Sequence, residues 1–142
     1  MANITYTDKI SVADYNALRA AVGWNLIEEE MAQTGLDHTW FLIVGKDGDK
    51  TISCLRLVGD GGYCMLIDDV MVHPDYQGQG IATHMMNECI AYVKRRLKPG
   101  QTTMVDLMAA KNRETFYLPF GFQLRPNDDH GAGMTQWFKY EE

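Results

Sequence analysis

The stretch that decides the fold runs from residue 69 to residue 82 and reads Asp69-Val70-Met71-Val72-His73-Pro74-Asp75-Tyr76-Gln77-Gly78-Gln79-Gly80-Ile81-Ala82. Its apolar first part predicts the end of a buried strand, and its last residues begin a helical pattern. A strand, a glycine turn and a helix N-terminus in this order gather unpaired backbone N–H groups, where the helix dipole also favours negative charge. Glycine at 78 and 80 leaves room for a phosphate to approach. We therefore predict an anion site formed by the amides of Gly78 to Thr83.

Two other glycine motifs do not fit this stretch. The dinucleotide-binding pattern Gly-x-Gly-x-x-Gly needs a third glycine near position 83, where the chain has Thr83. The nucleotide P-loop needs Gly-Lys-Ser or Gly-Lys-Thr, and the sequence contains neither. The stretch matches instead Gln/Arg-x-x-Gly-x-Gly/Ala at residues 77–82, which follow a Val-x-x-Pro strand end.

Working outward from this stretch, hydrophobic periodicity and turn residues predict the other elements. We expect strands at residues 4–7, 39–44, 51–58, 63–72 and 102–108, a further strand entered at 121–122, and a last strand at 134–140. We expect helices at residues 12–22, 25–33 with a stop at Gly35, 81–97, and 112–118. This order predicts an α/β fold with a mixed sheet, in a single domain that covers residues 1–142.

Composition agrees with one globular domain. The chain has 142 residues, of which 46% are hydrophobic and 23% charged, and no apolar run approaches the roughly 20 residues of a membrane span. The first residues show no secretory signal, so we expect a cytoplasmic protein. The net charge of −6 disfavours nucleic acid and favours the approach of cations, including amines. Cys54, Cys64 and Cys89 lie in apolar segments, and we expect all three to be buried free thiols.

The segment from residue 64 to residue 122 resembles the GCN5-related N-acetyltransferases (GNAT). In that family, a loop like that at residues 77–82 binds the pyrophosphate of acetyl-CoA. The second family motif is present as Asn112, Phe116-Tyr117 and Gly121-Phe122. The resemblance implies a central twisted mixed sheet with helices on both faces. Gly133-Met134 adds a likeness to small bacterial and plastid-type members, some of which acetylate arylalkylamines such as serotonin.

The resemblance also implies roles for individual residues. The backbone at Val70, Met71 and Val72 would bind the pantetheine arm and the thioester oxygen, while the valine side chains belong to the core. Tyr117 would be the general acid that protonates the departing thiolate, or a core tyrosine that packs on the cofactor. The residues expected to bind acetyl-CoA are Val70, Met71, Val72, Gln77, Gly78, Gln79, Gly80, Ile81, Ala82, Thr83, Asn112, Phe116 and Tyr117. Asn112 is also expected to cap the short helix that follows it.

Asp68 and Asp69 are charged residues in an otherwise apolar strand, so each needs a partner or a function. As neighbours on a strand they should point to opposite faces, which excludes a carboxylate dyad. One of them is a candidate base or amine anchor, and the other is a candidate for a hydrogen bond to loop backbone. We favour Asp69 for the functional role.

The sequence therefore predicts transfer of an acetyl group from acetyl-CoA to a primary amine by direct attack. Two alternatives remain open: a non-catalytic acetyl-CoA sensor, and an acetyltransferase for protein N-termini or lysines. The acidic run Glu28-Glu29-Glu30 either attracts a cationic amine or forms a solvated helix face. His73 and His130 lack the spacing of metal ligands, so we expect no metal. We expect a small-molecule partner, no nucleic acid and no membrane, and leave a homodimer open.

Overall fold

The structure is a computed structural model that describes residues 3–141 and divides the chain into two compact units, Met1–Leu107 and Met108–Glu142. The first unit holds strands β1 (Ile4–Thr7), β2 (Phe41–Asp47), β3 (Lys50–Gly59), β4 (Cys64–Val72) and β5 (Met104–Leu107). Its helices are α1 (Val12–Ala21), α2 (Glu29–Asp37) and α3 (Ile81–Arg96), with a 3-10 turn at Pro74–Tyr76. The second unit holds α4 (Glu114–Tyr117) and a 3-10 turn at Leu118–Phe120.

The five strands form one sheet in the order β1-β2-β3-β4-β5. The first four are antiparallel to their neighbours, while β5 runs parallel to β4. The parallel pair needs a crossover, and α3 supplies it between β4 and β5. The predicted α/β class with a mixed sheet is thereby confirmed.

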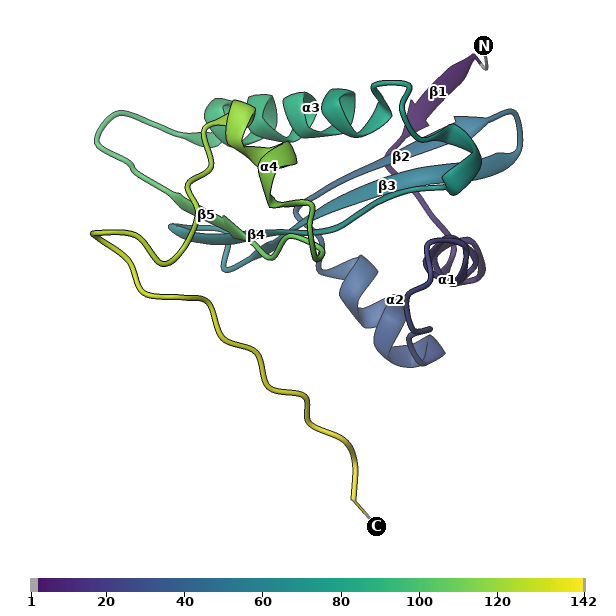
Figure 1. Ribbon diagram of the computed structural model, residues 1–142. Coiled ribbons are helices and arrows are strands. Elements are labelled where there is room, and N and C mark those ends of the chain that lie inside the picture. Colours follow the sequence, from purple (N-terminus) through teal and green to yellow (C-terminus); the bar gives the residue numbers. More distant parts are fainter. Residues whose placement is uncertain (1–2, 142) are drawn as a thin grey trace. The chain divides into compact units, whose positions relative to one another are not determined.

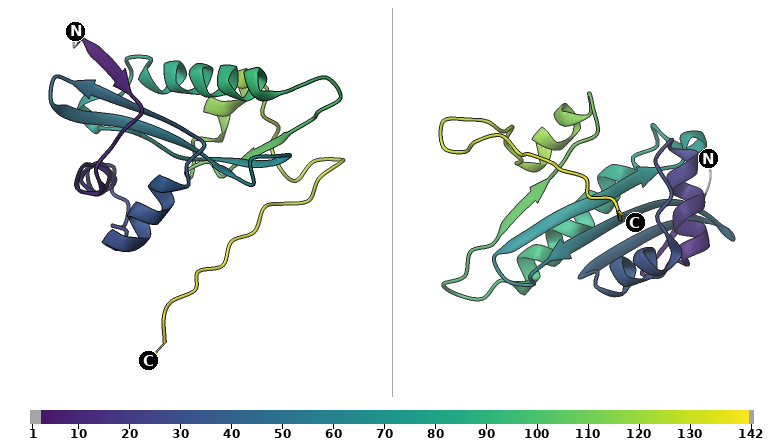
Figure 2. Two further views of the ribbon diagram at one scale, coloured as in Figure 1. Left: turned by 180° about the vertical axis from the view of Figure 1, so that it is seen from behind. Right: turned by 90° about the horizontal axis from the view of Figure 1, so that it is seen from below.

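Helices cover both faces of this sheet (Figures 1 and 2). α1 and α2 lie on one face, where their apolar side chains meet those of β2, β3 and β4. The buried members of this layer are Tyr15, Leu18, Ala32, Val44, Cys54 and Met71. α3 lies on the opposite face and buries Ile81, Met85, Met86 and Cys89. The sheet therefore has a hydrophobic layer on each side, as the resemblance implies.

Local sequence explains the ends of the two longest helices. Ser11 caps α1, because its hydroxyl accepts a hydrogen bond from the amide of Asp14 at 3.0 Å. α3 buries residues spaced by three or four, and Lys94, Arg95 and Arg96 in its last turn complement the negative end of the helix dipole. Both helices begin at the residue that the sequence predicts.

Other boundaries differ from the prediction. α2 begins four residues later than expected and continues through Gly35, since the carboxylate of Glu28 caps it by accepting from the amides of Glu30 and Met31, each at 2.9 Å. Cys64 is exposed rather than buried, because it begins β4 directly after a turn. Cys54 and Cys89 are buried free thiols, as expected.

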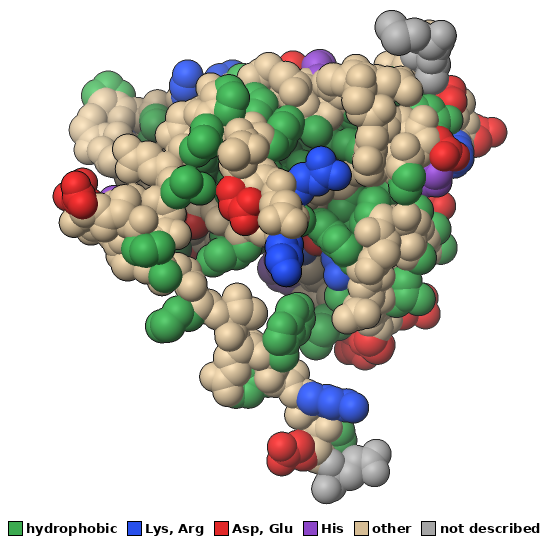
Figure 3. Space-filling view, in the orientation of Figure 1, with side chains coloured by type: hydrophobic (Ala, Val, Ile, Leu, Met, Phe, Trp, Pro, Cys, Tyr) green, Lys and Arg blue, Asp and Glu red, His purple; other side chains and the backbone are tan. Residues whose placement is uncertain are grey.

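The two strands predicted after residue 121 are wrong. Residues 121–141 contain no strand, and within residues 134–140 four large side chains are 86–91% exposed: Met134, Trp137, Phe138 and Tyr140. Figure 3 shows hydrophobic side chains along this C-terminal end of the chain. An alternating apolar segment forms a strand only when a neighbouring strand completes its hydrogen bonds, and alternation alone does not supply that neighbour.

The prediction of a single domain over residues 1–142 stays a prediction. Within residues 3–141, no helix combines the length and the apolar character that crossing a membrane requires.

Candidate active site

The glycine turn at the start of α3 has the geometry of an anion site. Gly78 and Gly80 have φ angles of +76° and +79°, a conformation that side-chain-bearing residues rarely adopt. A Cβ added at either position would meet no heavy atom within 4 Å, so the space beside the turn is open. Gly80 is the N-cap of α3 and offers no side-chain cap, which leaves the first helical amides available to a ligand.

The turn is held in place from both ends. The first helical hydrogen bond of α3 runs from the amide of His84 to the carbonyl of Gly80, at 3.0 Å. The amides of residues 81–83 lie before this bond, in the first turn of the helix. The side chain of Gln77 donates to the carbonyl of Val72 at 3.0 Å and ties the turn to the end of β4. The side-chain amide of Gln77 thus serves the loop, and the expected contact of Gln77 with a ligand stays a prediction.

β4 contains a bulge next to this turn. Arg56 of β3 pairs with Asp68, and Cys54 pairs with Met71, so one residue of β3 faces two residues of β4. Asp69 occupies the bulge with a φ of +53°, in the left-handed region. The strict alternation of side chains is broken at this point.

The bulge corrects the sequence prediction that Asp68 and Asp69 point to opposite faces. Both carboxylates contact the guanidinium of Arg56: Asp69 at 2.8 Å through Nε, and Asp68 at 3.7 Å through Nη2. The two acids therefore share one cation on the face that α1 and α2 cover. The assumption of regular alternation fails because β4 has one extra residue between its pairs Arg56–Asp68 and Cys54–Met71.

Asp69 lies at the centre of a buried polar cluster. Its side chain is 5% exposed and accepts hydrogen bonds from the hydroxyl of Tyr15 and from Arg19 at 3.0 Å, in addition to the contact with Arg56. Burial and the hydrogen bond to Asp69 raise the pKa of Tyr15, which keeps this phenol protonated as a donor. Two guanidinium groups thus compensate one buried carboxylate.

Asp68 differs from its neighbour in exposure and in the length of its ion pair with Arg56. Its side chain is 51% exposed, and its ion pair with Arg56 is longer than that of Asp69. Partial burial and then the charge of Asp69 raise the pKa of Asp68 above its usual range, while Arg56 opposes this shift. Of the two acids, Asp68 is the one whose carboxylate reaches solvent.

The ladder between β4 and β5 ends just before the two acids. Its last pair is Ile67 with Leu107, whereas β4 continues to Val72. β5 ends at Leu107, so β4 has no pairing with β5 from Asp68 onward. Met71 is fully buried, but Val70 and Val72 are only half-buried, so the prediction that both valines are core residues holds only in part.

The remaining predicted residues lie in the second unit. Tyr117 is buried, its ring contacts those of Phe116 and Phe122 edge-on, and burial raises the pKa of its phenol. The expectation that Asn112 caps α4 is wrong. Asn112 has a left-handed φ of +68°, and the N-cap is Arg113, whose side chain makes no capping hydrogen bond. Asparagine tolerates this conformation better than most residues, which explains its use at the turn.

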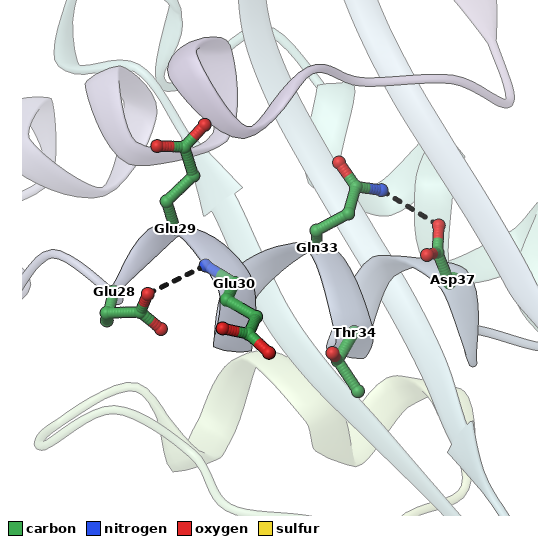
Figure 4. A pocket seen from close by; sticks show the side chains of 6 residues that line it. All are labelled: Glu28, Glu29, Glu30, Gln33, Thr34 and Asp37. Carbon is green, nitrogen blue, oxygen red and sulfur yellow. Dashed lines mark hydrogen bonds between the residues drawn. The ribbon is translucent and has the colours of Figure 1, made fainter.

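α2 carries an acidic surface hollow lined by Glu28, Glu29, Glu30, Gln33, Thr34 and Asp37 (Figure 4). The hydrogen bonds from the amides of Met31 and Glu30 lower the pKa of Glu28, which serves as the helix cap. Asp37 accepts a hydrogen bond from the side chain of Gln33 at 2.8 Å. Two of the acidic groups therefore have structural partners, which favours the interpretation of a solvated helix face.

Tyr15, Arg19 and Arg56 are the site residues that the sequence analysis missed. Arg56 is a cation within the apolar strand of residues 51–58, and such a residue requires a buried partner. Tyr15 and Arg19 are four residues apart and so share one face of α1. These signals indicate that each residue has a polar partner, but they do not identify it as Asp69.

Comparison with known proteins gives a consistent result. The family model "Acetyltransferase (GNAT) domain" matches residues 37–124, across both units. A crystal structure of a Staphylococcus aureus protein described as "Probable Acetyltransferase" is 30% identical with a TM-score of 0.81, over 96% of this chain and 100% of that one. A GNAT family acetyltransferase from Streptococcus pneumoniae is 29% identical with a TM-score of 0.76, over 99% and 100% of the two chains.

A curated relative extends the comparison beyond solved structures. The uncharacterized N-acetyltransferase ycf52 of Porphyra purpurea is 26% identical over 132 residues, which are 90% of this chain and 74% of the relative. The mixed sheet and the open glycine turn agree with these matches, which support acyltransferase activity. The chain belongs to the GNAT acetyltransferase family.

Proposed function

We propose that the protein transfers the acetyl group of acetyl-CoA to a primary amine by direct attack of the amine on the thioester. One observation carries this proposal: the half-exposed carboxylate of Asp68 lies at the bulge where β4 leaves β5, on the strand that leads into the glycine turn. The reaction needs an anion site for the pyrophosphate of acetyl-CoA and an acid for the amine.

The residues around the turn fit the pyrophosphate of acetyl-CoA. The free amides at residues 81–83 and the positive end of α3 favour a doubly charged group, and Gly78 and Gly80 leave space for it. The edge of β4 beyond Ile67 is free of β5, so the backbone of residues 70–72 can pair with the pantetheine amides. An amide aimed at the thioester oxygen would stabilise the charge that develops there, an effect worth about 10²–10³ in rate.

Asp68 is the acid that we assign to the amine. A carboxylate binds the ammonium form, and a raised pKa makes Asp68 a better acceptor for the proton that the amine must lose. The amine nitrogen then bonds to the acetyl carbon, the carbon–sulfur bond breaks, and the thiolate leaves and takes up a proton. Tyr117 is our candidate donor of that proton, as the family resemblance implies.

The two buried thiols, Cys54 and Cys89, are poorly suited to form an acyl-enzyme. A cysteine nucleophile needs a lowered pKa or an adjacent base. Burial instead raises the pKa of Cys54, and it raises the pKa of Cys89 to about 12. Neither thiol is therefore prepared to receive the acetyl group.

Two assays test the proposal together. Acetyl-CoA should raise the unfolding temperature of the wild type, with about 4 kcal/mol of stabilisation at a thousandfold excess over its Kd. Release of free thiol from acetyl-CoA should then require an added amine and rise with its concentration, in a panel that includes arylalkylamines and lysine peptides. Absence of a thermal shift would refute the acetyl-CoA site. A shift without thiol release across the panel would point to a non-catalytic sensor.

A further inference from the structure

The guanidinium of Arg56 joins three parts of the first unit. Its Nε contacts Asp69 at 2.8 Å, its Nη2 contacts Asp68 at 3.7 Å, and its Nη1 donates to the carbonyl of Gly35 at 3.0 Å and to the hydroxyl of Thr39 at 3.1 Å. Gly35 belongs to α2, Asp68 directly precedes the bulge of β4, and Asp69 lies in the bulge. The side chain is 11% exposed, so these contacts fix its position.

Asp69 holds Arg56 in place. The carboxylate of Asp69 is buried and also binds Arg19 and Tyr15 of α1, so it connects α1 to the same guanidinium. Asp69 is thus shielded from solvent and fully occupied. Asp68 contacts the outer nitrogen of Arg56 at 3.7 Å and a backbone hydrogen bond from Asp69 also favours its charge, yet its half-exposed carboxylate stays open to a substrate.

We infer that Arg56 is a positioning residue, which holds the Asp68 carboxylate at the strand opening and keeps it ionised for the incoming amine. The inference rests on the proposed function, because it assigns Asp68 to the amine. It adds a role for a residue of β3 that lies outside the glycine turn.

The charges around Asp68 make this role specific to Arg56. β4 contributes the like charge of Asp69, β3 contributes Arg56, and α1 contributes Arg19, which contacts Asp69 and lies farther along the cluster. α1 also brings the neutral phenol of Tyr15, while α2 reaches the guanidinium through a backbone carbonyl. Arg56 is therefore the cation in direct contact with Asp68, and Arg19 provides a matched control.

The first test measures Asp68 directly and needs no activity. Carboxyl carbons are labelled in aspartate, Asp68→Asn assigns the signal, and the titration is recorded for the wild type, Arg56→Gln and Arg19→Gln. We expect Arg56→Gln to raise the Asp68 pKa by about one unit, the effect of a unit charge at this distance in a water-like medium. Arg19→Gln should shift it less than half as far. An unchanged titration in Arg56→Gln, or an equal shift in Arg19→Gln, would overturn the inference.

A second measurement avoids a destabilised variant. The side-chain nitrogen signals of Arg56 in the wild type should follow the titration of Asp68, and Asp68→Asn should abolish that step while the fold is kept. A titration step that persists in Asp68→Asn would contradict the contact.

Kinetics then connect the contact to the reaction. In Arg56→Gln, the acidic limb of kcat/KM for the amine should move to higher pH by the same amount as the Asp68 signal, with acetyl-CoA affinity unchanged. In Arg56→Lys, which keeps the charge, the acidic limb of kcat/KM should return to the pH at which it lies in the wild type. A limb that stays in place in Arg56→Gln would refute the role in the reaction. Absence of acetyl transfer in the wild type would refute the proposed function. The two titrations would still test whether Arg56 controls the ionisation of Asp68.

Discussion

Replacement of Asp69 by asparagine should destabilise the protein strongly and affect the chemistry little. The carboxylate binds Arg19 at 3.0 Å and Arg56 at 2.8 Å, and the three side chains are 5%, 13% and 11% exposed for Asp69, Arg19 and Arg56. Removing one partner of a buried ion pair costs about 3–5 kcal/mol, because the other charge is left uncompensated.

Other contacts of the two arginines place the expected loss at the lower end of this range. Arg56 keeps the carbonyl of Gly35, and Arg19 keeps the carbonyl of Asn25 at 2.6 Å. We therefore expect a loss of about 3 kcal/mol in the free energy of unfolding for Asp69→Asn, and a fall in Tm of about 10 °C for a chain of this size.

Asp68→Asn is the matched control for this prediction. Asp68 is half-exposed and 3.7 Å from its cation, so its loss should change stability by no more than about 1 kcal/mol. Denaturant titrations at neutral pH, with the m-value checked for each variant, measure both changes. Amine kinetics on folded protein should show the opposite order, with Asp68→Asn the damaging change.

The sequence favours Asp69 for the functional role, whereas the exposure of Asp68 favours Asp68. The amine kinetics of the two variants decide between them. A stability loss below about 1 kcal/mol for Asp69→Asn would show that the cluster contributes little to stability. Normal amine kinetics in Asp68→Asn together with impaired kinetics in Asp69→Asn would return the role to Asp69.

Three further predictions concern the other groups of the site. Gly80→Glu should abolish the thermal shift with acetyl-CoA by placing a negative side chain in the anion site, whereas Gly100→Glu, with an equally open position and a φ of +84°, should lose similar stability and keep the shift. Tyr117→Phe should leave acetyl-CoA affinity nearly unchanged and lower turnover by up to about 10²–10⁴, and an unchanged kcat would reduce Tyr117 to packing. The pKa of Asp68 is raised in the folded state, so its ionisation lowers the free energy of unfolding of the wild type as the pH rises past 3.8. Asp68→Asn lacks this ionisation. Denaturant titrations from about pH 3 to pH 7 should therefore show the variant gaining stability relative to the wild type.

Local patterns were sufficient to predict most of the elements. The apolar residues of α3 recur every three or four positions, and the predicted helix differs from the observed one by a single residue at its end. The first strand agrees at both ends, at Ile4 and Thr7. α2 has only Ala32 fully buried, so it lacks a strong periodic signal, and its start was misplaced by four residues.

The glycine turn could be predicted in detail because its backbone geometry is one that few residues allow. Two glycines with positive φ before an apolar helix specify the open amides at residues 81–83 almost without reference to the rest of the chain. The roles of Asp68 and Asp69 depend instead on which side chains of α1 and β3 reach them. That information is long-range, and a single sequence does not contain it in local form.

The bulge in β4 is explained when backbone and charge are considered together. A left-handed conformation costs a typical side-chain-bearing residue roughly 1–2 kcal/mol, and aspartate tolerates it better than most. The cluster with Arg19 and Arg56 offsets this cost, so Asp69 suits the position for both its backbone and its charge. Asparagine shares the backbone tolerance and lacks the charge, and therefore Asp69→Asn isolates the electrostatic contribution. With Asp69 in the bulge, Asp68 lies at the surface beside Arg56, which leaves it accessible to the amine of the proposed reaction.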